Sequence, residues 1–342
     1  MIGRANGDAA VSITGFGCYV PERVLTNDEL ARLVDTSDEW IRERTGIRER
    51  RIAGPEQALS DLCVPAAEQA LEHAGVPARD VELLIVATVT PDMFFPSTGA
   101  ILADRLGAPD AAAYDLSAGC TGFMYALAQA YGMIAGGLVD RALVVGGDVL
   151  SRIMDWTDRS TCVLFGDGAG AVMLERVDAG GFHGFELGAD GGGGVHLNMP
   201  AGGSRIPATA ESIAARQHFA RMNGREVFKF ATRVLVSSAA AVLEACDTSV
   251  DDVDVYIPHQ ANVRIIDHAA KKLGIPDDRV VINVDRFGNT SSGSIPLGIA
   301  DAAADGRLRP GKLVLMTGMG AGLTWGSALM EWTAVFDGGG NG

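Results

Sequence analysis

The sequence predicts an α/β fold made of two similar halves, each with a mostly parallel sheet. Three pairs of segments repeat in the same order at a separation of about 170 residues: 71–85 with 243–257, 105–110 with 272–277, and 138–145 with 308–315. Within each half, apolar runs of strand length alternate with amphipathic helical patterns. A chain of 342 residues with 47% hydrophobic content is long enough for two cores. We therefore expect the halves at 10–178 and 179–335.

Local signals place several helix ends. Thr26 and Glu29 have the spacing of a capping box that opens a helix. Gly75 and Gly274 each follow a helical pattern and are expected to end it. Residues 191–220 are glycine-rich and then polar, and they have no counterpart in the first half. We interpret them as an inserted loop or cap of the kind that shapes a pocket.

Composition excludes several classes of protein. The formal net charge of −15 disfavours a nucleic-acid partner. No apolar run reaches about 18 residues and no signal-peptide pattern opens the chain, so we expect a cytoplasmic protein with no membrane span. The cysteines are odd in number, widely spaced and lack a CxxC pair, which argues against a disulfide framework and against a metal site built from cysteines. They are Cys18, Cys63, Cys120, Cys162 and Cys246.

Cys120 has the context of a nucleophile. It lies between an apolar strand and a helical pattern that begins near Met124, with Gly119 and Gly122 on either side. Helix N-termini stabilise negative charge, so a thiolate at Cys120 is expected to be favoured. The alternative is that Cys120 is one more buried, inert cysteine, which is our interpretation of the other four.

Two residues of the second half are candidates for the same site. His259 follows the apolar strand 253–258, and ligand sites of α/β folds lie at such strand ends. Asn289 comes shortly after the repeated segment 272–277, just as Cys120 comes shortly after the matching segment 105–110. A pseudo-twofold axis between the halves would therefore bring Asn289 and Cys120 together. The alternatives are a structural histidine and, for 288–294, an ordinary turn with a helix cap.

Six motifs in family order resemble the thiolase-like condensing enzymes, and most closely β-ketoacyl-[acyl-carrier-protein] synthase III. They are Thr36–Trp40 with Arg44–Arg50, the Cys120 turn, Phe165–Ala171, His259–Asn262, Gly288–Ser291 and Thr324–Ala328. The resemblance covers nearly the whole chain. It implies two pseudo-twofold-related halves in a layered α-β-α-β-α arrangement.

The resemblance also implies a reaction. Cys120 would take an acyl group from acyl-CoA and pass it to malonyl-ACP in a decarboxylative Claisen condensation that initiates fatty-acid synthesis. His259 and Asn289 would stabilise the malonyl enolate, and the main-chain donors of Cys120 and Ala321 would hold the second oxyanion. No cofactor is implied beyond the coenzyme A thioester substrate.

The same resemblance assigns binding residues and a homodimer. Trp40, Arg44, Arg159 and Asn262 would bind coenzyme A, and the basic run Arg42, Arg44, Arg48, Arg50 and Arg51 would suit its phosphates. Phe95 and Thr121 would line the acyl pocket, with Phe95 closing the partner's pocket across the dimer interface. Acyl carrier protein would dock on Lys229, Arg264, Lys271 and Lys272, with Arg225 nearby. An ordinary solvated helix face is the alternative for these last residues.

The sequence departs from the usual family pattern at two positions, and three other functions are compatible with its residues. The family often has glycine where this chain has Ala321, and alanine or serine where it has Thr121. Neither change removes a functional group. A related acyltransferase or condensing enzyme of specialised metabolism, a cysteine hydrolase with a Cys, His, Asn triad, and a non-catalytic scaffold use compatible residue types. Primer choice depends on pocket packing, which the sequence does not specify.

Overall fold

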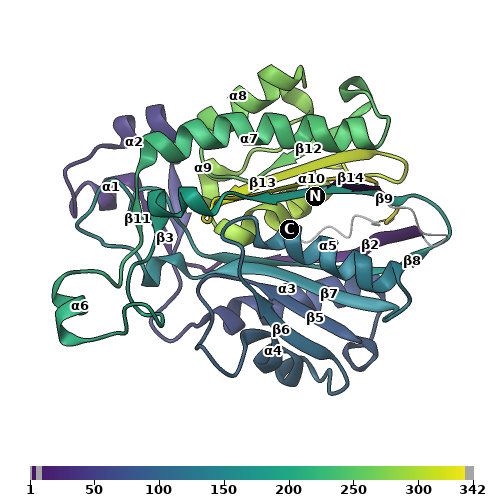
Figure 1. The fold of residues 1–342 in the computed structure, drawn as a ribbon, viewed down its shortest axis with the longest axis horizontal. Helices are drawn as coiled ribbons and strands as arrows, with labels where there is room; N and C mark the ends of the chain where they lie inside the picture. The colour runs from purple at the N-terminus through teal and green to yellow at the C-terminus, as the bar shows by residue number, and fades with distance from the viewer. Residues whose placement is uncertain (1, 5–9, 336–342) are drawn as a thin grey trace.

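The computed structural model describes residues 2–4 and 10–335, and these form two five-stranded sheets (Figure 1). In the first sheet the strand order is β2 (Ala10–Tyr19), β8 (Gly168–Val177), β7 (Arg141–Asp148), β5 (Leu83–Ala87) and β6 (Ala112–Leu116). Strands β5, β6 and β7 are parallel, whereas β8 runs antiparallel between β7 and β2. Strands β5 and β7 are nearly continuous apolar runs, as expected for strands covered on both faces.

The second sheet repeats this order. It consists of β1 (Ile2–Arg4), β9 (Gly181–Ala189), β14 (Thr324–Glu331), β13 (Leu313–Gly320) and β12 (Val255–Pro258). Strands β12, β13, β14 and β9 correspond to β5, β7, β8 and β2, so the predicted duplication is confirmed. The counterpart of β6 is reduced to one bridge between Tyr256 and Val280. Beyond this bridge, the Gln260 side chain accepts the N–H groups of Asn283 and Val284.

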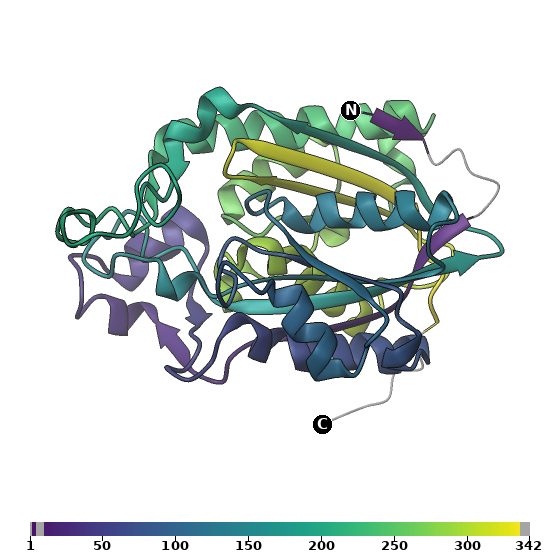
Figure 2. The same ribbon diagram turned by 60° about the horizontal axis from the view of Figure 1, so that its bottom comes forward.

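Six helices and the two sheets form five layers. Helices α3 (Leu59–Ala74) and α4 (Thr98–Leu106) cover the outer face of the first sheet, and α7 (Gly224–Ala245) and α8 (Val263–Leu273) cover that of the second (Figures 1 and 2). Helices α5 (Gly122–Ala135) and α10 (Ser294–Ala304) lie between the sheets. Their apolar side chains share one core with both sheets. The expected α-β-α-β-α arrangement is therefore present.

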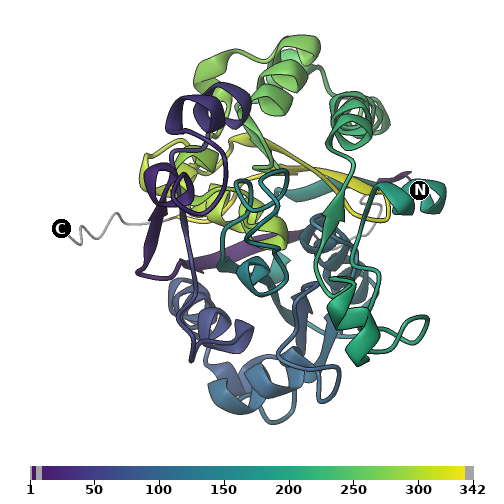
Figure 3. The same ribbon diagram turned by 90° about the vertical axis from the view of Figure 1, so that its left-hand side faces the viewer.

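Each half has an excursion between its first strand and its first long helix. In the first half it contains β3 (Val24–Thr26), α1 (Asn27–Leu30), α2 (Asp38–Thr45) and β4 (Glu49–Arg51); in the second it contains β10 (Leu197–Asn198), α6 (Ala210–Ala214) and β11 (Arg221–Met222). Both lie at the same end of the molecule (Figures 1 and 3). Segment 191–220 thus has a topological counterpart, contrary to our expectation. The two excursions differ in sequence and local structure, so repeat matching does not detect the relation.

The remaining helices are short, and the predicted ends are observed. They are α9 (Val284–Phe287) and the 3₁₀ helices Ala78–Asp80, Leu150–Arg152, Gly191–His196, Val250–Asp252, Asp277–Arg279 and Ser291–Gly293. Thr26 and Glu29 form the capping box, and Gly75 and Gly274 end their helices with φ of 66° and 81°. Among the described residues, no helix is long and apolar enough to cross a membrane, and no three His, Cys, Asp or Glu side chains are grouped to hold a metal ion.

Candidate active site

Cys120 lies on a turn that is packed backbone to backbone against a turn of the second half. It follows β6 and precedes α5, which begins at Gly122. A Cβ atom on Gly119 would lie 2.6 Å from the Ala321 amide nitrogen, and one on Gly320 would lie 2.4 Å from the Cys120 amide nitrogen. Only glycine permits this approach at both positions. The structure therefore brings Ala321 to Cys120, as the resemblance implies.

The electrostatics of Cys120 differ from our expectation. Burial raises the pKa of the Cys120 thiol to about 11. The Ser291 hydroxyl and the backbone N–H groups of Cys120 and Ala321 lower this pKa, and the Asp148 carboxylate raises it further. The backbone amides thus act in the predicted direction, but the prediction that a thiolate is favoured at Cys120 is wrong for the free protein. Removal of the thiol from water outweighs the nearby amide donors.

His259 is buried with one ring nitrogen fixed and the other unpaired. Its backbone N–H donates to Thr317 of β13 (2.7 Å), and its Nδ1 lies 2.6 Å from the Ser294 hydroxyl. Its Nε2 has no hydrogen-bond partner among the described residues. Burial lowers the pKa of the imidazole to about 4, so the ring is neutral at neutral pH. A neutral imidazole with one unpaired nitrogen is suited to bond a bound group.

Asn289 is held by the loop that precedes β8. Its N–H donates to Leu164 O (2.9 Å), and its carbonyl accepts the Gly166 N–H (3.0 Å). Its side-chain Oδ1 accepts the Ser291 N–H at 2.8 Å. No described residue accepts a hydrogen bond from its Nδ2 group, so this donor is available.

Serines connect the three candidate catalytic residues. The Ser292 hydroxyl donates to the carbonyl of Gly119 at 3.1 Å, which joins the Asn289 loop to the Cys120 turn. Ser294 joins the same loop to His259. Cys120 and Asn289 precede the equivalent helices α5 and α10, as the duplication predicts. The structure thus brings the Cys120 turn, His259 and Asn289 to one place.

Sequence reasoning missed four buried polar residues around this site. They are Asp148, Ser291, Ser292 and Ser294. A signal for Asp148 was present, because it is a carboxylate that ends the apolar run 142–147. The serines belong to a polar run that we assigned only to a turn. Ser291 adopts a left-handed φ of 52°, and its hydroxyl has no partner with hydrogen-bond geometry among the described residues.

The four residues assigned to coenzyme A lie together. The guanidinium carbons of Arg44 and Arg159 are each 5.3 Å from the Trp40 ring centroid. Arg159 also donates to the Asp35 carbonyl at 2.6 Å. Asn262 caps α8 by accepting the Arg264 N–H (2.9 Å), and its Nδ2 donates to Arg44 O (3.0 Å). Their assignment to coenzyme A stays a prediction.

The basic run does not act as one surface. Arg50 is completely buried and donates to Leu25 O, Asn27 Oδ1 and Val163 O at 2.8–3.1 Å. It cannot contact a phosphate on the surface, so this expectation is wrong for Arg50. Its side chain lies on the buried face of β4. Successive side chains of a strand point to opposite faces, so Glu49 and Arg51 point away from the buried face.

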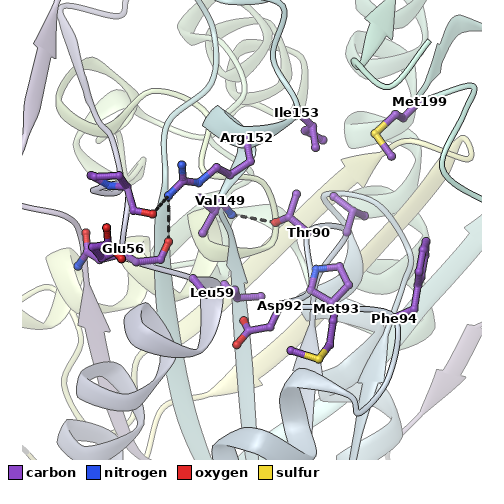
Figure 4. A pocket seen from close by; sticks show the side chains of 15 residues that line it. Glu56, Leu59, Thr90, Asp92, Met93, Phe94, Val149, Arg152, Ile153 and Met199 are labelled. Atoms are coloured by element: carbon purple, nitrogen blue, oxygen red, sulfur yellow. Dashed lines mark hydrogen bonds between the residues drawn. The ribbon is translucent and has the colours of Figure 1, made fainter. Parts of the chain in front are cut away.

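The two acyl-pocket residues occupy different environments. Thr121 is buried, and its hydroxyl lies 3.1 Å from the hydroxyl of Thr324. Phe94 and Phe95 are 81% and 85% exposed on the loop between β5 and α4. A cavity of about 560 Å³ opens beside this loop, and Met93 and Phe94 line it opposite Ile153 and Met199 (Figure 4). Phe95 is not one of its lining residues.

The residues assigned to carrier-protein docking share a surface but do not form a tight cluster. Arg264 packs over the Phe228 ring of α7 at 5.5 Å, which places α7 and α8 side by side. Lys229 pairs with Glu226 at 2.8 Å. Lys271 and Lys272 are exposed at the other end of α8, about 10 Å from Arg264 along the helix axis. Their assignment to carrier-protein docking stays a prediction.

Comparison with known proteins identifies the family of this chain. The model for 3-oxoacyl-[acyl-carrier-protein] synthase III matches residues 114–191, and the model for its C-terminal part matches 243–332. The β-ketoacyl-[acyl-carrier-protein] synthases III of Desulfitobacterium hafniense (strain Y51) and Symbiobacterium thermophilum are 52% and 54% identical over 325 and 323 residues, covering 95% and 94% of this chain and 98% of each relative.

A solved structure agrees over the same length. The crystal structure of the β-ketoacyl-[acyl-carrier-protein] synthase III from Thermus thermophilus is 45% identical, with a TM-score of 0.88 over 95% of this chain and 100% of that chain. The fold is thus the thiolase-like one that the motifs imply. The chain belongs to the β-ketoacyl-[acyl-carrier-protein] synthase III family, the condensing acyltransferases that initiate fatty-acid synthesis.

Proposed function

We propose that Cys120 is the nucleophile of the acylation half-reaction. Its sulfur attacks the thioester carbonyl of an acyl-CoA, a new bond forms between sulfur and the acyl carbon, and the bond to the coenzyme A sulfur breaks. The thiol proton leaves as the new bond forms, and the released coenzyme A thiolate is protonated. The N–H groups of Cys120 and Ala321 support this role, because both act on the sulfur and can stabilise the oxyanion.

His259 and Asn289 carry the condensation half-reaction. Malonyl-ACP loses carbon dioxide, and the electron pair of the broken bond forms an enolate on its thioester. Nε2 of His259 and Nδ2 of Asn289 donate hydrogen bonds to the enolate oxygen. The role is supported by the lack of a partner on His259 Nε2 among the described residues and by the Ser291 N–H bond that orients the Asn289 amide. The enolate carbon attacks the acyl-Cys120 carbonyl, which forms β-ketoacyl-ACP and returns the sulfur to the enzyme as a thiolate, which then takes up a proton.

The observation that carries this proposal is the convergence of three segments on Cys120. Three segments meet at Cys120, and each carries one of the proposed donors. They are the Ala321 turn with its N–H, the Asn289 loop with Nδ2, and the end of β12, which His259 follows, with Nε2. The neutral state of His259 also supports it, because a neutral imidazole donates a hydrogen bond to an enolate without first giving up a proton.

Acyl-CoA and acyl carrier protein are the proposed partners. Coenzyme A binds over Trp40 with Arg44, Arg159 and Asn262, and this requires Arg159 to move off the ring to admit the adenine. Carrier protein, which is acidic, docks on the exposed face formed by Lys229, Arg264, Lys271 and Lys272. No cofactor is part of the proposed reaction.

The active enzyme is proposed to be a homodimer. Two adjacent phenylalanines that are more than four-fifths exposed are unusual on a monomer surface. Burying them against a second copy removes this apolar area from water. In this arrangement Phe95 closes the acyl pocket of the partner, which includes Thr121.

Intact-mass spectrometry tests the acylation step. The purified protein and its Cys120→Ala variant are incubated with a panel of short straight and branched acyl-CoA thioesters. We expect one acyl group on the wild type and none on Cys120→Ala, whereas Cys162→Ala, which removes a different buried thiol, is acylated like the wild type. Acylation of Cys120→Ala, or no acylation of the wild type by any thioester, would contradict the assignment.

A further inference from the structure

A buried carboxylate outside the proposed catalytic set lies behind the Cys120 turn. Asp148 is the last residue of β7 and is completely buried. Its Oδ1 accepts four hydrogen bonds from the segment that follows β5: from Thr88 Oγ1 (2.8 Å), Val89 N (2.8 Å), Thr90 N (3.1 Å) and Thr90 Oγ1 (2.9 Å). Thr90 Oγ1 also accepts the Val149 N–H at 2.8 Å (Figure 4). Oδ1 thus fixes the start of the loop that carries Phe95.

The other oxygen of this carboxylate contacts the Asn289 loop. Oδ2 of Asp148 accepts the Ser292 N–H at 3.3 Å. The Ser292 hydroxyl donates to the carbonyl of Gly119, the residue before Cys120. Asp148 therefore contacts the Asn289 loop and the loop that carries Phe95, and it is linked through Ser292 to the Cys120 turn. These three segments come from distant parts of the chain.

The groups that contact the Asp148 carboxylate are hydrogen-bond donors. Within the described residues no Lys, Arg or His side chain pairs with it, and the five hydrogen bonds above are all donated to it. Burial raises the pKa of Asp148, while the nearby Ser291 hydroxyl and the hydrogen bonds from Val89, Thr88 and Thr90 lower it. Its negative charge raises the pKa of the Cys120 thiol and that of the Cys63 thiol on α3.

We propose that Asp148 is a positioning residue for condensation, which holds the Asn289 loop against the Cys120 turn through Ser292. The inference rests on the proposed roles of Cys120 and Asn289. The inference predicts opposite effects on the reactivity of the free Cys120 thiol and on the rate of condensation, whereas a general structural defect would lower both. Loss of the charge makes the free thiol more reactive, whereas loss of the Ser292 contact makes condensation slower.

Asp148→Asn is the sharpest test, because it has nearly the same shape. Its Oδ1 can keep the four hydrogen bonds from Thr88, Val89 and Thr90, but its Nδ2 now meets the Ser292 N–H, so two donors oppose each other. We expect the midpoint of Cys120 alkylation by iodoacetamide to move to lower pH by about one unit. We also expect condensation with malonyl-ACP to slow by about tenfold or more, measured from the pre-acylated enzyme, while acylation is unchanged or faster.

Asp167→Asn is the matched control. Asp167 is also completely buried with a pKa raised by burial, and it accepts hydrogen bonds from Ala53 N, Ser151 N and Ser151 Oγ. Its charge is not among the main causes that set the pKa of the Cys120 thiol. We expect Asp167→Asn to lower the melting temperature without moving the alkylation midpoint or the ratio of the two half-reactions.

A second variant keeps the inference testable if Asp148→Asn does not fold. Ser292→Ala retains the charge of Asp148 and its backbone contact, and removes only the hydroxyl bond to Gly119. We expect it to lower the ratio of condensation to acylation and to leave the alkylation midpoint in place.

The outcomes are distinguishable. An Asp148→Asn variant with an unchanged midpoint and an unchanged ratio overturns the inference, as does one that slows both half-reactions equally, in the manner of a general defect. If that variant does not fold, an unchanged ratio in Ser292→Ala overturns it. A wild-type enzyme that is never acylated overturns the proposed function instead.

Discussion

The Nδ1 atom of His259 lies 2.6 Å from the hydroxyl of Ser294, the first residue of α10. This contact fixes the ring of a histidine whose Nε2 has no partner among the described residues. When the Ser294 hydroxyl donates to Nδ1, the ring proton resides on Nε2, which is the donor that the enolate requires.

Ser294→Ala therefore should impair condensation selectively. Loss of one hydrogen bond to a buried ring corresponds to about 1–1.5 kcal/mol, or about a tenfold decrease in the condensation rate. Acylation by acyl-CoA should change little. Stopped-flow measurement of both half-reactions checks this, with Ser238→Ala as control, since Ser238 is buried and hydrogen bonded to Ser327 at 2.7 Å in another part of the chain. Equal loss in both half-reactions would contradict the assigned role of Ser294.

The pH dependence should report a neutral His259. Because burial lowers its pKa from 6.5 to about 4, the acid limb of the condensation rate should fall near pH 4 and not near pH 6.5. Between these values the unfolded chain binds a proton that the folded protein does not. The free energy of unfolding should thus decrease as pH falls from 6.5 to 4, by up to about 3 kcal/mol from this group. Chemical denaturation of wild type and His259→Asn, which should lack this contribution, measures the difference.

Gly320→Ala should damage the site through the backbone. Its Cβ would lie 2.4 Å from the Cys120 amide nitrogen, so one of the two turns must move. We expect acylation to fall at least about a hundredfold, the scale of losing an oxyanion donor. Gly132→Ala is the control: Gly132 lies inside α5 with nothing near its Cβ position, so alanine should stabilise the protein by about 0.5–1 kcal/mol. Wild-type acylation in Gly320→Ala would contradict the assigned oxyanion site.

Phe95→Ala should change the choice of primer without destabilising the protomer, because Phe95 is 85% exposed there. Shortening a side chain that closes the partner's pocket should raise the rate with longer acyl-CoA thioesters relative to acetyl-CoA by about tenfold or more. Phe94→Ala, at 81% exposure, should affect dimer stability but not chain-length preference. Acylation rates across a chain-length series, with sedimentation analysis, compare the two variants. The same preference in both would exclude Phe95 from the pocket.

Much of the fold follows from patterns that act locally. Apolar strand runs, the Thr26 capping box and the glycines after α3 and α8 depend on nearby residues, and the internal repeat adds the relation between the halves. Cys120, His259 and Asn289 could be selected because each follows a strand or a repeat. The rest depends on packing between distant segments. The burial that raises the pKa of Cys120, and the enclosure of Arg50, arise only when residues more than a hundred positions apart meet.

The most direct test of the account is a single turnover of the acyl-enzyme. Wild-type protein carrying one acyl group on Cys120 is mixed with malonyl-ACP labelled in its free carboxyl carbon, and carbon dioxide, acyl-enzyme and ACP products are followed together. We predict one labelled carbon dioxide and one β-ketoacyl-ACP for each acyl group lost from Cys120, and a much slower turnover in His259→Ala and Asn289→Ala. Release of the acyl group as a free acid, or an acyl-enzyme that malonyl-ACP leaves intact, would contradict the central claim.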